Sequence, residues 1–193
     1  MERSILERNE IIQQTKLELL NYVYCYYQID ELEQILINDT VNCWIPSYIP
    51  KRLSLNIPTL KASNKPERLE YLTLLCSLLN TWSRRGIYQV TGKIIFASNA
   101  QTAVVVLQKV LSHDVSPLNE HTSSPELDAV ISRILNLLPR HEASIAYYRN
   151  LKVFDTDKLY ILKPLAYRFW SKTTALNDAD EIAAAILTND YRG

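Results

Sequence analysis

Residues that could do acid–base or metal chemistry are few and scattered in this chain. His113, His121 and His141 stand at spacings that match no metal-binding motif, and none shares a ligand spacing with a cysteine. A phosphate-cradling glycine loop, a GxSxG elbow and an HExxH motif are all missing from the sequence. The sequence therefore predicts neither a metal site nor a nucleophile or base built on histidine or cysteine.

Two groups of carboxylates are close in the sequence: Asp155 with Asp157, and Asp178 with Asp180 and Glu181. Such groups can hold Mg²⁺ or divide acid–base work, which would suit a metal-dependent hydrolase. The second group directly follows Asn177, which we expect to cap the last helix. Negative charge in a first helical turn is favoured by the helix dipole, so we interpret that group as a helix start.

Glycine is scarce. Only three glycines occur in 193 residues, and one of them is the C-terminal Gly193. Because glycine supplies the positive φ angles and close backbone approaches of many catalytic loops, we expect no enzyme, no cofactor and no small-molecule substrate. If any backbone approaches a ligand closely, we expect it at Gly86 or Gly92, in the most basic part of the chain.

The cysteines and the N-terminus bear on the compartment. Cys25, Cys43 and Cys76 are too few and too far apart for a disulfide framework, so we read them as small apolar residues of a reducing compartment. The start of the chain lacks a signal peptide, and no apolar run approaches the length of a membrane span. These features predict a cytoplasmic protein without a membrane partner.

The chain combines cations with aromatic rings in segments of opposite charge. Residues 1–50 carry three basic and eight acidic side chains (3 − 8 = −5), whereas residues 51–109 carry nine and two (9 − 2 = +7). Cations next to flat rings suit the phosphates and bases of nucleic acid, although a ring in such a cluster can equally belong to the core. The candidate nucleic-acid-binding residues are Lys51, Arg52, Arg84, Arg85, Lys93, Arg149, Lys152, Arg168 and Lys172.

The sequence pattern predicts that these residues lie mostly on helices or in the loops between them. Apolar periodicity and caps predict helices over residues 4–27, 30–38, 66–86, 98–112, 124–138, 141–151, 164–172 and 177–187. Residues 87–96 fit a small hairpin or a linking helix, and we favour the helix. Residues 41–65 are expected to form a long proline-rich ordered loop, and residues 113–124 a polar loop. The expected fold is a single all-α domain over 1–193, a bundle of seven or eight helices with at most one hairpin.

One stretch resembles a known family. Residues 160–170 (YILKPLAYRFW) and 175–182 (ALNDADEI) look like the C-terminal end of the large subunit of type I-D CRISPR effector complexes, a part that is also made separately as a small subunit. This resemblance implies a non-catalytic subunit of an RNA-guided antiviral complex. Its implied partners are single-stranded DNA or an RNA–DNA hybrid backbone, other subunits and copies of itself. No functional residues are carried over from the family.

A different class of function stays open. The tyrosine-rich first helix and the proline-rich loop also suit a helical protein-interaction adaptor or regulator that binds no nucleic acid. In that case Tyr26 and Trp44 would matter to function, and the Arg84–Arg85 pair would not.

Overall fold

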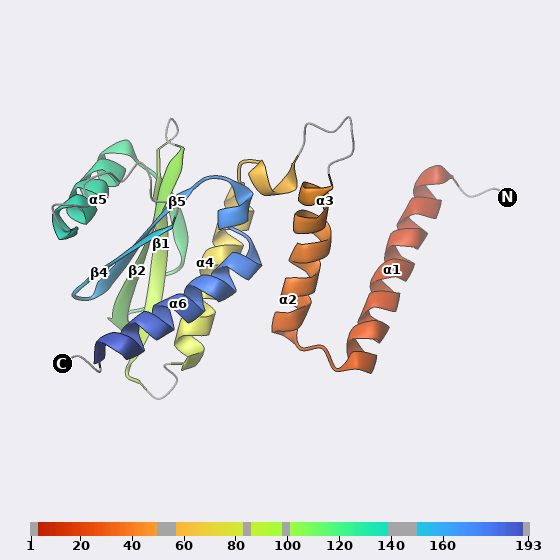
Figure 1. The fold of residues 1–193 in the computed structure, drawn as a ribbon, viewed down its shortest axis with the longest axis horizontal. Helices are drawn as coiled ribbons and strands as arrows, with labels where there is room; N and C mark the ends of the chain where they lie inside the picture. Colours follow the sequence, from red (N-terminus) through yellow and green to blue (C-terminus); the bar gives the residue numbers. More distant parts are fainter. Residues whose placement is uncertain (1–3, 50–56, 83–85, 98–100, 139–149, 191–193) are drawn as a thin grey trace.

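The computed structural model describes residues 4–49, 57–82, 86–97, 101–138 and 150–190, the last with side chains to residue 188. It contains a mixed α/β body and an N-terminal helical arm, which we define as residues 4–49 (Figure 1). The body is built on a five-stranded sheet, so the prediction of an all-α bundle was wrong.

The sheet has the strand order β3-β1-β2-β5-β4. Its strands are β1 (Tyr88–Phe96), β2 (Thr102–Leu111), β3 (Asn119–Thr122), β4 (Leu151–Asp155) and β5 (Lys158–Pro164). β1 pairs with β3 in parallel, and every other neighbouring pair is antiparallel. Asp155, Thr156 and Asp157, one of the two carboxylate groups noted in the sequence, form the tip of the β4–β5 hairpin.

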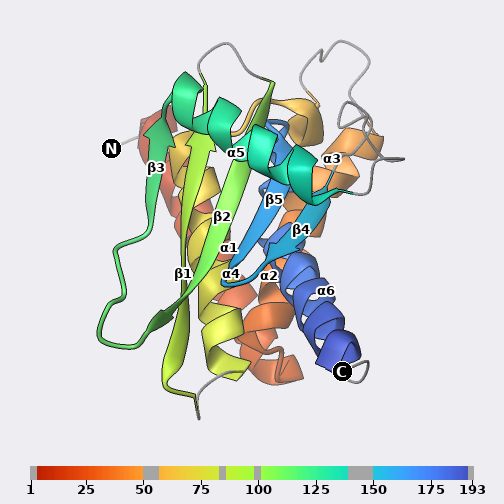
Figure 2. The same ribbon diagram turned by 90° about the vertical axis from the view of Figure 1, so that its left-hand side faces the viewer.

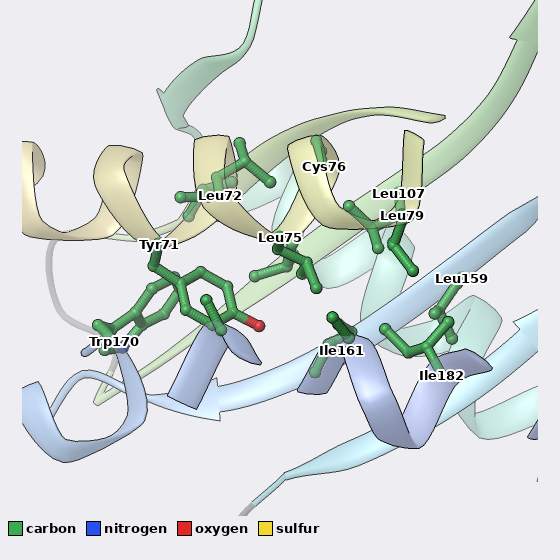
Figure 3. Packing of buried hydrophobic residues seen from close by; sticks show 14 of the residues in the cluster. Tyr71, Leu72, Leu75, Cys76, Leu79, Leu107, Leu159, Ile161, Trp170 and Ile182 are labelled. Carbon is green, nitrogen blue, oxygen red and sulfur yellow. The ribbon is translucent and has the colours of Figure 1, made fainter. Parts of the chain in front are cut away.

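Helices cover both faces of this sheet (Figures 1 and 2). α4 (Lys65–Trp82) and α6 (Lys172–Asp190) pack on one face, and α5 (Ser124–Leu137) packs on the other. Neighbouring strand residues accordingly alternate between two cores, with Val105 and Ile161 in the first and Val104 and Leu162 in the second. Figure 3 shows the first core, where Leu75 meets the strands.

The predicted helix over residues 98–112 and the favoured helix over 87–96 were wrong for one reason. β1 and β2 are buried on both faces, so the run Ala103-Val104-Val105-Val106-Leu107 is continuously apolar and lacks the alternation of a half-exposed strand. Its β-branched side chains favour strand. The predicted helix over 141–151 lies largely outside the described residues, and its end, Leu151, opens β4.

Several predicted helices are confirmed. α1 (Ile5–Tyr27) begins after Ser4, whose side chain forms a capping box with Glu7, and α2 (Glu31–Asp39) begins in the same way after Asp30. α4 and α5 also occupy their predicted segments. The predicted helix over 164–172 is instead the end of β5 followed by a 3₁₀ turn, η5 (Tyr167–Phe169), and α6 starts earlier than the predicted cap at Asn177.

The predicted loop over residues 41–65 is partly helical. α2 continues through a π-helical turn, η1 (Thr40–Trp44), into α3 (Ile45–Tyr48). In this turn the Ile45 N–H bonds to the Thr40 carbonyl, five residues back. Pro46 is the second residue of α3 and lies directly after this π-helical turn. A 3₁₀ turn, η2 (Pro58–Leu60), follows residues 50–56, which lie outside the described part.

The arm lies beside the α4 and α6 layer, with α2 next to the body and α1 outermost (Figure 1). Asp39 of α2 accepts a hydrogen bond from the Thr173 N–H at the start of α6 (2.8 Å). Tyr24 of α1 donates through its hydroxyl to Asn38 of α2 (3.2 Å). None of the described helices is both long enough and apolar enough to cross a membrane.

Candidate functional site

Five of the nine predicted nucleic-acid-binding residues lie outside the described residues. These five are Lys51, Arg52, Arg84, Arg85 and Arg149. The other four, Lys93, Lys152, Arg168 and Lys172, belong to β1, β4, the η5 turn and α6 respectively.

Carboxylates already hold three of these four cations. The Lys93 ammonium lies 2.5 Å from Glu126 of α5, and that of Lys172 lies 3.3 Å from Glu70 of α4. Lys152 pairs with both Asp178 (2.7 Å) and Glu181 of α6. These lysines connect a strand or helix to its neighbour and do not form one common patch on the described surface.

Arg168 differs from the other three. Its guanidinium lies 4.8 Å from the centre of the Phe169 ring, an intramolecular cation–π contact. Its Nε is buried and has no hydrogen-bond partner among the described residues. The predicted combination of cation and ring is therefore present at this position, as a contact within the chain.

The most concentrated group of polar chemistry in the body is centred on Asp178. Its carboxylate accepts hydrogen bonds from the Tyr71 hydroxyl (2.8 Å), the Asn150 amide (2.8 Å) and the Lys163 ammonium (2.5 Å). Lys163 also donates to the Phe169 carbonyl (2.8 Å). Lys163 is fully buried and Asp178 is 1% exposed, so this network belongs to the protein core.

The environment shifts the pKa of each group in this network. Burial alone would raise the pKa of Asp178, but attraction to Lys163 and hydrogen bonds from Lys152, Lys163 and Asn150 outweigh burial and lower it to about 2. Burial lowers the pKa of Lys163 to about 8, against the attraction of Asp178. Burial and the adjacent Asp178 charge raise the pKa of Tyr71 well above its ordinary value.

This network does not offer the chemistry of a metal-dependent hydrolase. Asp178 lies within α6 and not in a first turn, and its partners are already cations and hydrogen-bond donors. Asp180 is exposed on the same helix, so the two carboxylates do not form a pair. Among the described residues, no group of three His, Cys, Asp or Glu side chains could hold a metal ion.

A second buried ion pair joins α4 to β3. The Arg68 guanidinium makes a two-pronged contact with Glu120 (2.8 and 2.9 Å), and both side chains are less than a tenth exposed. Arg68 also contacts the face of Phe96. Sequence reasoning missed both buried pairs; for Lys163 the available signal was a charged residue within the apolar run LYILKPLA at residues 159–166.

Two hollows lie beside the arm. The first, of about 250 Å³, is lined by residues of α2, η1, α4, η5 and α6 and by Trp170, and most of these residues are polar. Its carboxylates already have partners: Asp39 accepts a hydrogen bond from the α6 backbone, Glu67 accepts one from Lys61, and Glu70 forms an ion pair with Lys172. The second is an open groove of about 530 Å³ lined mostly by α4, with Ile35 and Lys172 at its border.

Most of the exposed large hydrophobic side chains among the described residues lie on the arm. Of the 26 large hydrophobic side chains that are exposed among the described residues, 16 lie in residues 4–49 and ten lie on α1 alone. In α1 only Tyr24 is buried. An exposed apolar patch larger than a monomer usually shows is typical of an interaction site.

One row of these side chains recurs at a spacing of seven residues along α1. We define the α1 stripe as Ile5 (78% exposed), Ile12 (49%), Leu19 (63%), Val23 (38%) and Tyr26 (82%). Residues seven apart, or three and four apart, share one side of a helix, so the stripe runs along most of α1. It is the candidate binding surface that the geometry favours.

Neither the protein-family models, nor the curated proteins, nor the solved structures compared with this chain gave a match.

Proposed function

We propose that this chain is a non-catalytic interaction subunit, in which an α/β body presents a helical arm that binds another protein. The observation that carries this proposal is the concentration of exposed apolar side chains on residues 4–49, above all on α1. This proposal keeps the protein-interaction adaptor that the sequence left open as an alternative. The fold that carries it is a mixed α/β fold and not a helical bundle.

Energetics support a binding role for α1. Most helices in proteins are stabilised by packing an amphipathic face, and isolated helices are marginal in water. α1 is 23 residues long yet buries only Tyr24 completely. Covering its exposed side chains would gain roughly 25 cal/mol for each Å² of apolar surface removed from water.

The body supports a non-catalytic role. Its most concentrated polar groups, around Asp178, are buried, and the described candidate lysines are paired with carboxylates. The three cysteines are free, which supports a reducing compartment such as the cytoplasm.

Membership of a type I-D CRISPR complex remains a prediction from the sequence. The segment that resembles that family forms β5, the η5 turn and the first half of α6. Many of its side chains, including Lys163, Trp170 and Asp178, are buried. Because these residues are buried, their resemblance to the family bears on the fold more directly than on a binding surface.

The proposal is tested by sizing the native chain in cell extract. We expect it to elute in an assembly well above its own 22.3 kDa. The variant Ile12→Asp/Leu19→Asp should elute alone, because two carboxylates on the stripe oppose burial. Its unfolding free energy should change by less than about 1 kcal/mol, since both residues are exposed.

A matched control places the same charges on exposed apolar residues of α6. Ile186→Asp/Leu187→Asp should leave the chain in the assembly. Elution of the wild-type chain at its monomer mass would contradict the proposal, as would equal loss of assembly in both double variants.

A further inference from the structure

The charged residues that border the α1 stripe are of one sign. Arg8 lies three residues after Ile5 and four before Ile12, and Lys16 lies four after Ile12 and three before Leu19, so both cations border the apolar row. Both are exposed, and among the described residues neither has an ion-pair partner.

The acidic residues of α1 lie elsewhere on the helix. At 3.6 residues per turn, Glu7, Glu10 and Glu18 fall on the side away from the stripe. Glu7 is held by the capping box at Ser4, and Glu18 accepts from Gln14. The arm is acidic as a whole, but within residues 4–27 the charged side chains that border the apolar stripe are all cations.

This charge pattern opposes pairing of the stripe with that of a second copy. The stripe extends from Ile5 to Tyr26, so Lys16 lies at its middle. With Ile5, Ile12 and Leu19 at the a positions of a heptad, Arg8 is at a d position, so a parallel pair would face Arg8 with Arg8 in the seam. An antiparallel pair would bring the two Lys16 side chains together at the centre. Like charges across such a seam disfavour the pairing.

Building on the proposed function, we propose that the α1 stripe binds an apolar helix of another protein whose border is acidic. Arg8 and Lys16 are eight residues apart, about 12 Å along the helix. The partner helix therefore carries Asp or Glu about two turns apart on either side of its apolar row. Apolar burial supplies the affinity, and the charge pairs select the partner and its register.

The test uses the full chain and two synthetic amphipathic helices with leucine at the core positions of each heptad. One peptide has Glu at the flanking positions, and the other has Lys. Fluorescence anisotropy at low salt should show micromolar binding of the Glu peptide and binding of the Lys peptide at least about tenfold weaker. Raising the salt to 0.5 M should reduce this difference, because exposed charges are screened.

Two variants of equal charge change locate the effect. Arg8→Glu/Lys16→Glu should reverse the preference in favour of the Lys peptide. Lys109→Glu/Lys158→Glu, on β2 and β5, should preserve the wild-type preference. Circular dichroism would verify that both variants keep the wild-type helix content.

Four results would overturn the inference: no binding of the Glu peptide, equal affinity for the two peptides, loss of preference in the β2/β5 variant, or dimerisation of the chain through the stripe. Displacement of the Glu peptide by single-stranded DNA at the same site would instead assign the cations to nucleic acid. The two proposals can fail separately. If the cellular assembly depends on Ile12 and Leu19 but not on Arg8 and Lys16, the interaction role stands and the acidic partner does not.

Discussion

The pairing of Asp178 with Lys163 removes two opposite charges from water inside one core. Burial of either charge alone would be strongly unfavourable, whereas the pair, with Tyr71, Asn150 and Lys152 around it, satisfies most of its hydrogen bonds. These groups belong to different elements, so the pair fixes how α6 lies on β5 and α4. Its role is to specify the packing of the body.

Removing one partner should therefore be much worse than removing both. Asp178→Ala leaves the Lys163 ammonium buried without its counter-charge and should lower the free energy of unfolding by about 3–5 kcal/mol. The double variant Lys163→Met/Asp178→Leu should lose clearly less. Urea denaturation of the three proteins measures both values, and a single variant within about 1 kcal/mol of wild type would contradict this account.

Acid should destabilise the protein through the same carboxylate. The folded pKa of Asp178, about 2, is below its ordinary value of 3.8, so its contribution is complete above about pH 5 and is lost as the pH falls towards 2. The loss amounts to about 2 kcal/mol. Urea denaturation between pH 2 and 5 should show a shallower pH dependence for Asp178→Asn, and parallel curves would exclude this role.

At the scale of elements, the contact of α4 with the sheet explains one of the few glycines. A Cβ atom on Gly92 of β1 would lie 2.8 Å from Leu107 Cδ2 and 2.9 Å from Leu72 Cδ1. Glycine here lets α4 approach the strands closely. The sequence led us to expect a ligand close to this backbone, and in the structure the side chains of Leu72 and Leu107 lie there instead. Both neighbouring leucines are buried, which limits their freedom to move.

Gly92→Ala should consequently destabilise the body by about 1–3 kcal/mol through overpacking. The double variant Gly92→Ala/Leu107→Val should lose less than the sum of the two single variants, because valine lacks the δ-methyl group in closest contact. Thermal unfolding of the four proteins checks the coupling, and simple additivity would argue against the contact.

At the scale of the whole molecule, the chain divides into a body that buries its apolar residues and an arm that exposes them. This division separates two kinds of variant: changes in the body act on stability, and changes on the α1 stripe act on association. Among the described candidates for nucleic-acid binding, Lys93, Lys152 and Lys172 are engaged with carboxylates of the protein itself.

We expect single-stranded DNA to bind the isolated chain weakly. Lys93 and Lys172 each form an ion pair with a carboxylate of the protein. The variant Lys93→Glu/Lys172→Glu should therefore change the affinity for DNA by less than about twofold. Titrations at 50 and 200 mM salt measure this. A strong salt dependence that these reversals remove would restore the nucleic-acid interface predicted from the sequence.

Local sequence determined the elements whose signals are local. The capping boxes at Ser4 and Asp30 and the apolar periods of α1, α4 and α5 mark helices, because caps and amphipathic faces are encoded within a few turns. The apolar row from Ile5 to Tyr26, with its spacing of seven residues, can likewise be recognised in the sequence. Its exposure cannot, because burial depends on what packs against the helix.

Tertiary structure alone decided the rest. Strands covered on both faces lose the alternation that identifies a strand, so β1, β2 and β5 became recognisable only once helices lay on either side. The partners of Lys93, Lys152 and Lys163 are up to 33 residues away in the chain, and a list of cations cannot show which are already paired. The sequence determined which cations and apolar rows the protein has. The fold decided which of the cations are paired within the protein and which apolar rows stay exposed to a partner.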